Sequence, residues 1–97
     1  MPVDLHFICR HGLNHKHLGN QRHETGNWAV GDETANSAVR VYLHETQKSK
    51  AWHGGRIISW RRASAEGRKI FKYEVDGDFR IRCPGPWGQE KAIVNRL

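Results

Sequence analysis

Short segments in which apolar and polar residues alternate recur along the chain, and this pattern restricts the fold more than any other feature. VDLHFIC at residues 3–9 places its apolar side chains on one face of an extended strand, and VRVYLHE at residues 39–45 repeats the pattern. RIISW at residues 56–60 has β-branched residues at its centre, and KAIVNRL at residues 91–97 is a further candidate strand. The chain is therefore expected to be rich in short β-strands.

The segment IFKYEVDGDFRIRC predicts a β-hairpin, because two alternating runs flank a loop at residues 76–78 with Gly77 at its centre. The expected register pairs Val75 with Phe79, Tyr73 with Ile81 and Phe71 with Cys83. On the other face Glu74 lies opposite Arg80, and Lys72 lies opposite Arg82. Like charges placed directly opposite each other destabilise a sheet. This face therefore either binds an anion or lets the two long side chains splay into solvent.

The other segments predict less regular structure. Residues 10–27 are polar, contain glycine and show no sustained period, so they are expected to form a long loop. Residues 28–30 form a short apolar anchor, and Asp32 is a candidate cap for a brief helix that runs to Asn36. Residues 46–50 read as a turn, and PGPWG at residues 84–88 interrupts the strand before it.

A chain of 97 residues is short for more than one hydrophobic core, so residues 1–97 are expected to form a single domain. About five to six short strands with one or two short helices indicate an α+β fold that is mostly β. A flat sheet of this size would not enclose a core, so a strongly curved sheet or small pseudobarrel is expected. Four tryptophans, two tyrosines and three phenylalanines can supply much of that core.

Positive charge is concentrated in the second half of the chain. Residues 1–48 contain five Lys and Arg against five Asp and Glu, whereas residues 49–97 contain eleven against five. The whole formal charge of +6 therefore belongs to the second half. A basic surface of this kind favours a polyanionic partner.

Cys9 and Cys83 are the only cysteines, and both fall on the inward side of predicted strands. The first residues lack the basic start and long apolar run of a secretory signal, and no segment is long enough to span a membrane. A cytoplasmic protein with two reduced, buried thiols is the expectation.

The stretch AWHGGRIISW is the strongest candidate for a binding surface. Trp52 is expected to be partly exposed at a strand entrance, where Gly54 and Gly55 let a backbone or a flat ligand approach closely. Trp60 has the alternation of a core residue. An exposed aromatic ring among cations suits base stacking and phosphate binding. The candidate nucleic-acid-binding residues of this half are Trp52, His53, Arg56, Arg61, Arg62, Lys72, Arg82 and Trp87, the last of which could instead plug one end of the barrel.

A group of histidines gives a competing hypothesis. Imidazole and thiolate are ligands of the type that zinc prefers, and they recur between residues 9 and 23, at Cys9, His11, His15, His17 and His23. The spacing matches no standard zinc motif and no second ligand pair is present, so no metal and no cofactor are expected. The chain contains no nucleophile elbow, phosphate-binding glycine loop or spaced carboxylate pair, so no catalytic residue is assigned. His44 or His53, with Glu45 nearby in the sequence, remains the only acid or base candidate.

The order of these segments resembles the PUA-like superfamily, especially its EVE and ASCH branches. The resemblance is carried by a first strand before a basic turn, NWAVGD at residues 27–32, VRVYLHE, the glycine-led GGRIISW and the predicted hairpin. It implies a pseudobarrel with a cleft that binds RNA, or a single modified base flipped into an aromatic pocket. Trp28 and Trp52 would be pocket walls, and Arg10 and His11 would lie at the mouth of the cleft.

Two functions therefore follow from the sequence. The first is a non-catalytic nucleic-acid-binding domain that reads RNA or DNA, with a modified base as a candidate ligand. The second is a small histidine-based or metal-dependent enzyme acting on a nucleic acid or another phosphate substrate. A protein-binding accessory domain is a third alternative.

Overall fold

The computed structural model describes residues 2–9, 15–64, 66–77, 79–85, 87–88 and 91–96, with only the backbone of His15. Seven strands and one short helix lie within these residues. In chain order they are β1 (Val3–Ile8), β2 (His15–Gly19), β3 (Arg22–Ala29), α1 (Asp32–Ser37), β4 (Ala38–His44), β5 (His53–Arg62), β6 (Arg68–Glu74) and β7 (Lys91–Asn95).

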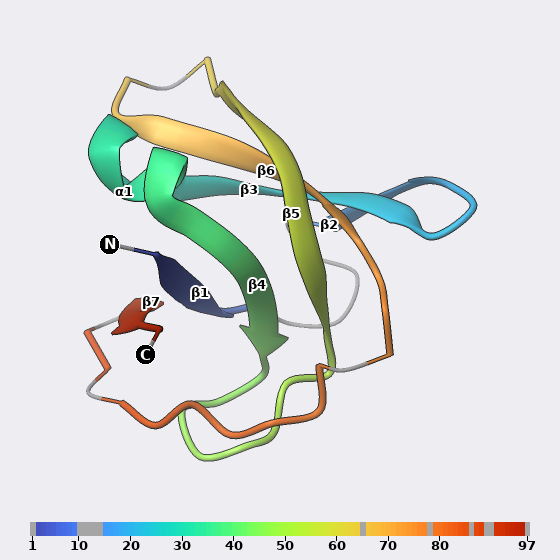
Figure 1. Ribbon diagram of the computed structural model, residues 1–97, viewed down its shortest axis with the longest axis vertical. Coiled ribbons are helices and arrows are strands. Elements are labelled where there is room, and N and C mark those ends of the chain that lie inside the picture. The colour runs from blue at the N-terminus through green and yellow to red at the C-terminus, as the bar shows by residue number, and fades with distance from the viewer. Residues whose placement is uncertain are drawn as a thin grey trace.

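All seven strands belong to one strongly curved sheet, in the order β2-β3-β6-β5-β4-β1-β7 (Figure 1). β1 and β4 are parallel, and the hairpin β2–β3 and helix α1 lie between them in the sequence. The other neighbouring strands are antiparallel. The sheet is not closed into a barrel, because β2 and β7 form its two edges. The predicted β-rich α+β class is confirmed, with seven strands in place of five or six.

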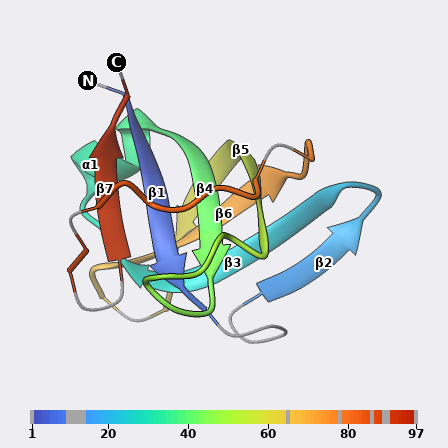
Figure 2. The same cartoon turned by 90° about the horizontal axis from the view of Figure 1, so that it is seen from below.

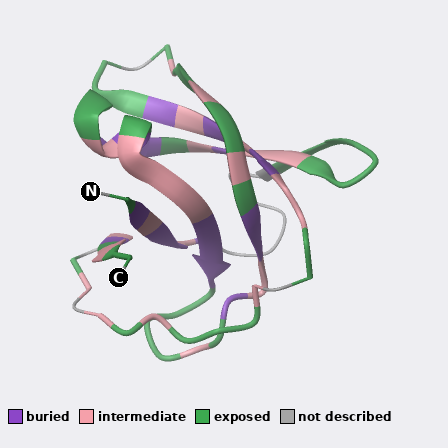
Figure 3. Cartoon of the chain, viewed as in Figure 1, coloured by how far each residue is buried: buried purple, intermediate pink, exposed green. Residues whose placement is uncertain are grey.

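The core lies on the inner, concave face of the sheet. Phe7 stacks on Trp28 with ring centroids 4.3 Å apart and planes at 4°, and Phe71 packs against Phe7 at 6.1 Å. Leu5 and Tyr73 are also fully buried on this face. The buried residues are concentrated in the middle of the sheet, whereas the tip of the hairpin β2–β3 is exposed (Figure 3). One aromatic-rich core is thus enough for this small domain.

The predicted long loop at residues 10–27 is wrong over most of its length, because residues 15–29 form the hairpin β2–β3. Its two strands carry polar residues on both faces. The apolar alternation on which strand prediction depends is therefore missing here. Residues 10–14 lie outside the described residues.

The predicted hairpin of residues 71–83 is also wrong. Residues 79–85 form no strand, and both edges of β6 are occupied, by β3 on one side and β5 on the other. Lys72 lies opposite Glu24 and Ser59, not opposite Arg82, so the predicted like-charge pair does not exist. Glu74 likewise lies opposite Arg22 and Arg56, not opposite Arg80. The glycine in the turn was predicted correctly, since Gly77 has a φ of 80°.

Residues 79–85 and 87–88, here the cover segment, cross the outer face of β4 and β1 (Figure 2). The Ala51 amide donates to the Ile81 carbonyl, and the Gln47 side chain donates to the Gly88 carbonyl at 3.1 Å. The indole of Trp87 lies edge-on to His6 and His44. One half of the outer face is therefore covered, and the half formed by β2, β3, β6 and β5 is open.

Three remaining predictions can be compared with the structure. The predicted short helix is present, but Asp32 is its first residue and not its cap: the N-cap is Gly31, and the Asp32 carboxylate binds cations instead. The strands predicted at residues 39–45 and 91–97 are confirmed as β4 and β7. The strand predicted at residues 56–60 is longer, since β5 covers His53–Arg62.

The two cysteines should react with thiol reagents at different rates. Cys9 is buried and Cys83 is half-buried in the irregular cover segment, and they are not joined in a disulfide. Burial raises the pKa of Cys9 to about 11 and also raises the pKa of Cys83. We expect Cys83 to be labelled at least about tenfold faster than Cys9 in the native protein, with similar rates after denaturation. Mass spectrometry of timed labelling reactions measures both rates, and equal native rates would contradict the burial of Cys9.

Candidate nucleic-acid interface

The open half of the outer face is built from cross-strand rows of charged side chains. One row runs across β2, β3, β6 and β5 and contains Lys16, Glu24, Lys72 and Ser59. Residues opposite each other in a sheet share a face, so these side chains point the same way. In this row a carboxylate lies between two lysines.

The second row contains Arg22, Glu74, Arg56 and Arg40 on β3, β6, β5 and β4. Arg61 lies opposite Ile70 and belongs to the same face. We call this surface the basic face and define it by Lys16, Arg22, Arg56, Arg61 and Lys72, with the carboxylates of Glu24 and Glu74 between them. Five cations against two carboxylates make it strongly positive.

The two carboxylates hold two of the arginines. The Arg61 guanidinium donates to both carboxylate oxygens of Glu24, at 3.2 and 3.4 Å. Arg22 lies 3.8 Å from Glu74. No described residue forms an ion pair with Lys16, Arg56 or Lys72, so these three cations are the best placed to meet an anion from solvent. Exposed pairs such as Arg61 with Glu24 contribute little stability, which leaves the arginine available to exchange partners.

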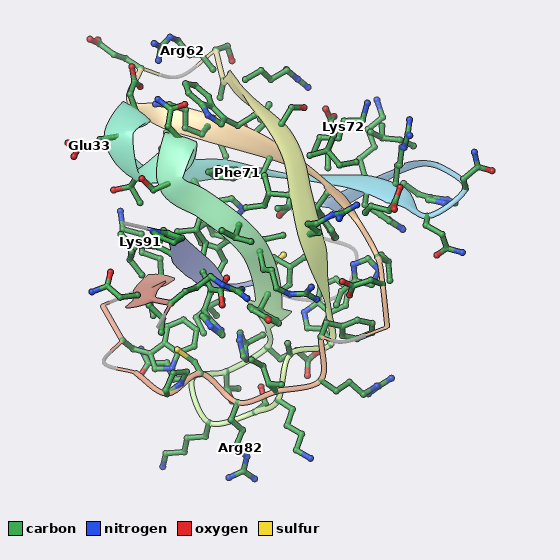
Figure 4. All side chains as sticks on the ribbon, in the orientation of Figure 1. Glu33, Arg62, Phe71, Lys72, Arg82 and Lys91 are labelled. Carbon is green, nitrogen blue, oxygen red and sulfur yellow. The ribbon has the colours of Figure 1, made fainter. Side chains whose placement is uncertain are left out.

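A hollow of about 240 Å³ lies on the basic face, lined by Glu24, Ser59, Trp60, Arg61, Ile70 and Lys72. It combines two predicted site residues, Arg61 and Lys72, with a hydroxyl and a carboxylate. A hydroxyl and two cations can together bind a phosphate oxygen. Lys72 projects from the β5–β6 side of the molecule, while Arg82 projects from the opposite end (Figure 4).

Arg62 is not part of the basic face. It lies opposite Lys69 across β5 and β6, and the Asp32 carboxylate bridges the two cations. Arg62 donates to both carboxylate oxygens of Asp32, at 2.7 and 2.8 Å. The Lys69 Nζ lies 3.0 Å from Asp32 Oδ1. Hydrogen bonds from Arg62 and then Lys69 hold the pKa of Asp32 well below its usual range. This predicted phosphate ligand therefore lies beside a carboxylate that the buried Lys69 also holds in place.

The predicted tryptophans lie in three different places. Trp28 is 4% exposed and stacks in the core, with its indole nitrogen donating to the Thr25 hydroxyl. Trp52 is half-buried and donates to the Cys9 carbonyl at 2.6 Å. Trp87 is part of the cover segment, and its indole nitrogen is buried without a hydrogen-bond partner among the described residues. The structure does not bring these three rings together as the walls of one pocket.

Two predicted roles on β5 are confirmed: a neighbouring backbone approaches closely at Gly54 and Gly55, and Trp60 packs against the core. Gly54 and Gly55 are buried and admit a neighbouring backbone: Gly54 packs against Val41 and Tyr42, and Gly55 against Glu74 and Val75. Trp60 is half-buried and lines the hollow, with its indole nitrogen donating to the Asn36 side chain at 3.1 Å. Arg10 and His11, the predicted cleft mouth, lie outside the described residues.

His53 lies at the far end of β5, close to two other histidines. The ring of His23 contacts both His17 and His53, with centroids 4.5 Å apart in each case. Among the described side chains, no three His, Cys, Asp or Glu groups are arranged to hold a metal ion. The histidines between residues 9 and 23 were predicted as one group, and the contact of His23 with His53 is visible only in the fold.

Lys16 and Arg22 of the basic face are not among the residues predicted from the sequence. Both lie on the hairpin β2–β3, which had been predicted as a loop. A strand assignment would have placed Arg22 and Glu24 on one face by alternation, but their position beside Lys72 depends on the pairing of β3 with β6.

Comparison with protein-family models finds no match, and the same is true of comparisons with curated proteins and with solved structures. No helix among the described residues is long and apolar enough to cross a membrane. The fold and the site therefore define a small, open, curved β-sheet domain with one basic face.

Proposed function

We propose that this chain is a nucleic-acid-binding domain that contacts the sugar-phosphate backbone through the basic face. The observation that carries the proposal is the cross-strand arrangement of Lys16, Arg22, Arg56, Arg61 and Lys72 on one open surface. A phosphate backbone presents a regular line of negative charges, and cations on adjacent strands offer a matching array. Binding of this kind assigns no catalytic role to any residue.

The hollow supports a specific role for two of these residues. Arg61 uses Nε and Nη2 to bind Glu24, which leaves Nη1 for an external acceptor. Lys72 adds a second donor, and Ser59 lies opposite it in the register. The Arg61–Glu24 pair is neutral overall, so the lining matches the single negative charge of an internal phosphodiester.

The finer part of the proposal is recognition of one modified base by a PUA-like pseudobarrel. The strong curvature of the sheet and the strand, insertion and helix order before β4 support this fold comparison. Trp52 supports base stacking because it is half-buried beside His53, with ring centroids 5.5 Å apart. Affinities for matched oligonucleotides with and without a modified cytosine or adenine test the recognition, and equal affinities would remove it.

The proposed contacts should change the salt dependence of binding. Each phosphate contact releases condensed counterions, so Arg56→Ala and Lys72→Ala should each reduce the slope of log affinity against log salt by about one unit. The double variant should reduce it by about two units, and base preference should not change. Fluorescence anisotropy with single- and double-stranded oligonucleotides at four salt concentrations measures the slope.

Lys48→Ala is the matched control, because it removes one exposed cation from the turn between β4 and β5, outside the basic face. Its salt slope should equal that of the unaltered protein. If the folded protein binds no RNA or DNA at low salt, the proposed function is wrong. If Lys48→Ala and Lys72→Ala have the same effect, binding is real but does not use the basic face.

A further inference from the structure

Every Trp, Tyr and Phe of the chain lies among the described residues, so the position of each of these aromatic rings is known. The other three of the nine rings are Tyr42, which is buried and stacks on His6, and Phe79 and Trp87, which belong to the cover segment. The first six belong to the core or pack directly against it: Phe7, Trp28, Trp52, Trp60, Phe71 and Tyr73. Since all nine are described, no Trp, Tyr or Phe is a member of the basic face.

Trp60 is the one aromatic residue that lines the hollow on the basic face. Its indole nitrogen donates to the Asn36 side chain, and the cationic groups of Arg62 and Lys69 lie 5.5 and 5.4 Å from the centroid of its ring. Cations in this position are attracted to the negative face of the ring. The Trp60 ring therefore already has internal partners, and it also packs against the core.

The absence of a free ring restricts the kind of nucleic acid that suits the basic face. Proteins that bind single strands combine a positive groove with aromatic rings on which the unpaired bases stack. The basic face offers the cations and the Ser59 hydroxyl, which are donors to phosphate and sugar oxygens. Contacts of this type recognise the backbone and leave the bases without a partner.

The strand pairing also fixes the spacing of the cations. Lys16, Arg56 and Lys72 lie on β2, β5 and β6, and no described residue forms an ion pair with them. A duplex has a persistence length of ~50 nm, so its phosphates are already ordered before binding. A flexible single strand must be ordered along the face, which costs conformational entropy. A rigid array of cations therefore favours the stiffer ligand.

We propose that the basic face binds double-stranded nucleic acid in preference to single strands. In a duplex the bases stack on each other and the two backbones form the outer surface, so binding requires no aromatic ring. A duplex also carries one negative charge per ~1.7 Å of its axis, which is more than one strand alone offers. The inference rests on the proposed function for the fact of binding and deepens it by naming the strand state of the ligand.

The salt dependence gives this preference an expected size. Contacts of three cations with phosphates predict a slope of log affinity against log salt of about −2.7 for a duplex and about −2.1 for a single strand. If the two affinities are equal at about 1 M salt, these slopes alone make binding of the duplex about sixfold tighter at about 50 mM salt.

The experiment measures the affinity of the full chain for a short duplex of mixed sequence and for each of its separated strands. Fluorescence anisotropy at low salt should show at least about fivefold tighter binding of the duplex, with the steeper salt slope. The comparison is made with DNA and with RNA, and the polymer that binds more tightly decides. A single strand that lacks every second base should bind within about twofold of the complete strand, because the contacts are with the backbone.

Two variants connect the preference with the basic face. Lys16→Ala should reduce the salt slope by about 0.9 for the duplex and by about 0.7 for the single strand. Lys48→Ala, outside the basic face, should leave both slopes and the preference unchanged. Circular dichroism confirms that each variant is folded.

Each unfavourable outcome has a distinct meaning. Equal or tighter binding of single strands would overturn the preference and leave the binding function standing. A larger loss of affinity for the strand that lacks bases would show that the bases contribute, and it would also overturn the inference. If Lys16→Ala behaves like Lys48→Ala, the preference does not come from the basic face and the inference is wrong. Absence of binding to any of these ligands would remove the proposed function itself.

Discussion

Replacement of Gly55 by alanine is expected to destabilise the fold by at least about 3 kcal/mol, a large fraction of the stability of a small domain. A Cβ at this position would lie 2.7 Å from the Glu74 carbonyl carbon and 2.9 Å from Val75 Cα, and both atoms belong to the backbone. Backbone atoms cannot rotate away as the end of a side chain can, so β5 and β6 would have to separate. Denaturant unfolding followed by tryptophan fluorescence measures the loss.

Gly31→Ala is the matched control for this variant. No atom lies within 4 Å of a Cβ built on Gly31, and its φ of −70° suits any residue. Its stability should stay within about 1 kcal/mol of the unaltered protein, since only a small N-cap preference is lost. Equal stability of the Gly55 and Gly31 variants would contradict the close approach of β5 to β6.

Acid is expected to destabilise the protein between about pH 6.5 and pH 4, because two buried histidines must stay neutral in the fold. His6 Nδ1 and His44 Nε2 lie 2.8 Å apart, and both rings are about 1% exposed or less. His44 Nδ1–H donates to the Ser49 carbonyl at 2.9 Å, so His44 Nε2 accepts and His6 Nδ1 donates.

The sign of the effect follows from the two folded-state pKa values. Burial, and then the neighbouring His44, lower the pKa of His6 from 6.5 to about 4, and burial lowers the pKa of His44. Below pH 6.5 the unfolded chain binds protons that the folded protein refuses, so stability falls until His6 itself titrates near pH 4. At ~1.4 kcal/mol per pKa unit, His6 alone accounts for a loss on the order of 3 kcal/mol. The lowered pKa of Asp32 acts only below the ordinary aspartate range of 3.8 and does not overlap this window.

Unfolding free energies measured at half-unit pH intervals test this prediction, together with nuclear magnetic resonance titration of the imidazole protons. The exposed-site variant His17→Asn should keep the same pH dependence. Stability that is flat from pH 7 to pH 4.5, or a His6 resonance that titrates near pH 6.5, would contradict a neutral buried pair.

The strands that were predicted correctly are those with an apolar face and a polar face. β1 and β4 have apolar residues at every second position on the core side, so their alternation is visible without a structure. Even there the pattern was incomplete. His6 and His44 lie on the outward side of these strands but are buried, because the cover segment packs on that side.

The loop predicted at residues 10–27 and the hairpin predicted at residues 71–83 are wrong for a common reason, which is that pairing partners are tertiary information. The hairpin predicted for residues 71–83 had good local alternation and a suitable turn glycine, yet β3 and β5 occupy both edges of β6. The hairpin β2–β3 had no apolar alternation, yet it forms because β6 offers an edge to Thr25 and its neighbours. Local pattern cannot distinguish a real partner strand from an unused one.

The basic composition of the second half was visible in the sequence, but the identity of the available cations was not. Arg56 and Arg61 lie on the basic face, as the aromatic and basic strand predicted. Lys72 also lies there, although the like-charge pair that singled it out does not exist. Arg62 is paired with Asp32 across 30 positions of sequence, and only the fold reveals that pair. Trp28 was predicted to be a pocket wall from the family resemblance. In the structure it is buried because its ring stacks on Phe7 in the core.

Under the proposed function, the cover segment also limits the length of nucleic acid that one molecule can contact. It closes the outer face over β4 and β1, so the accessible width is that of four adjacent strands, β2, β3, β6 and β5. Strands are spaced ~4.8 Å apart, which makes this width about 14 Å between the outer strand axes. A nucleic-acid strand in a duplex advances ~3.4 Å per nucleotide, so one molecule spans about four nucleotides. A longer polymer therefore gains affinity by offering more registers and by accommodating more copies of the protein, not by making more contacts with each one.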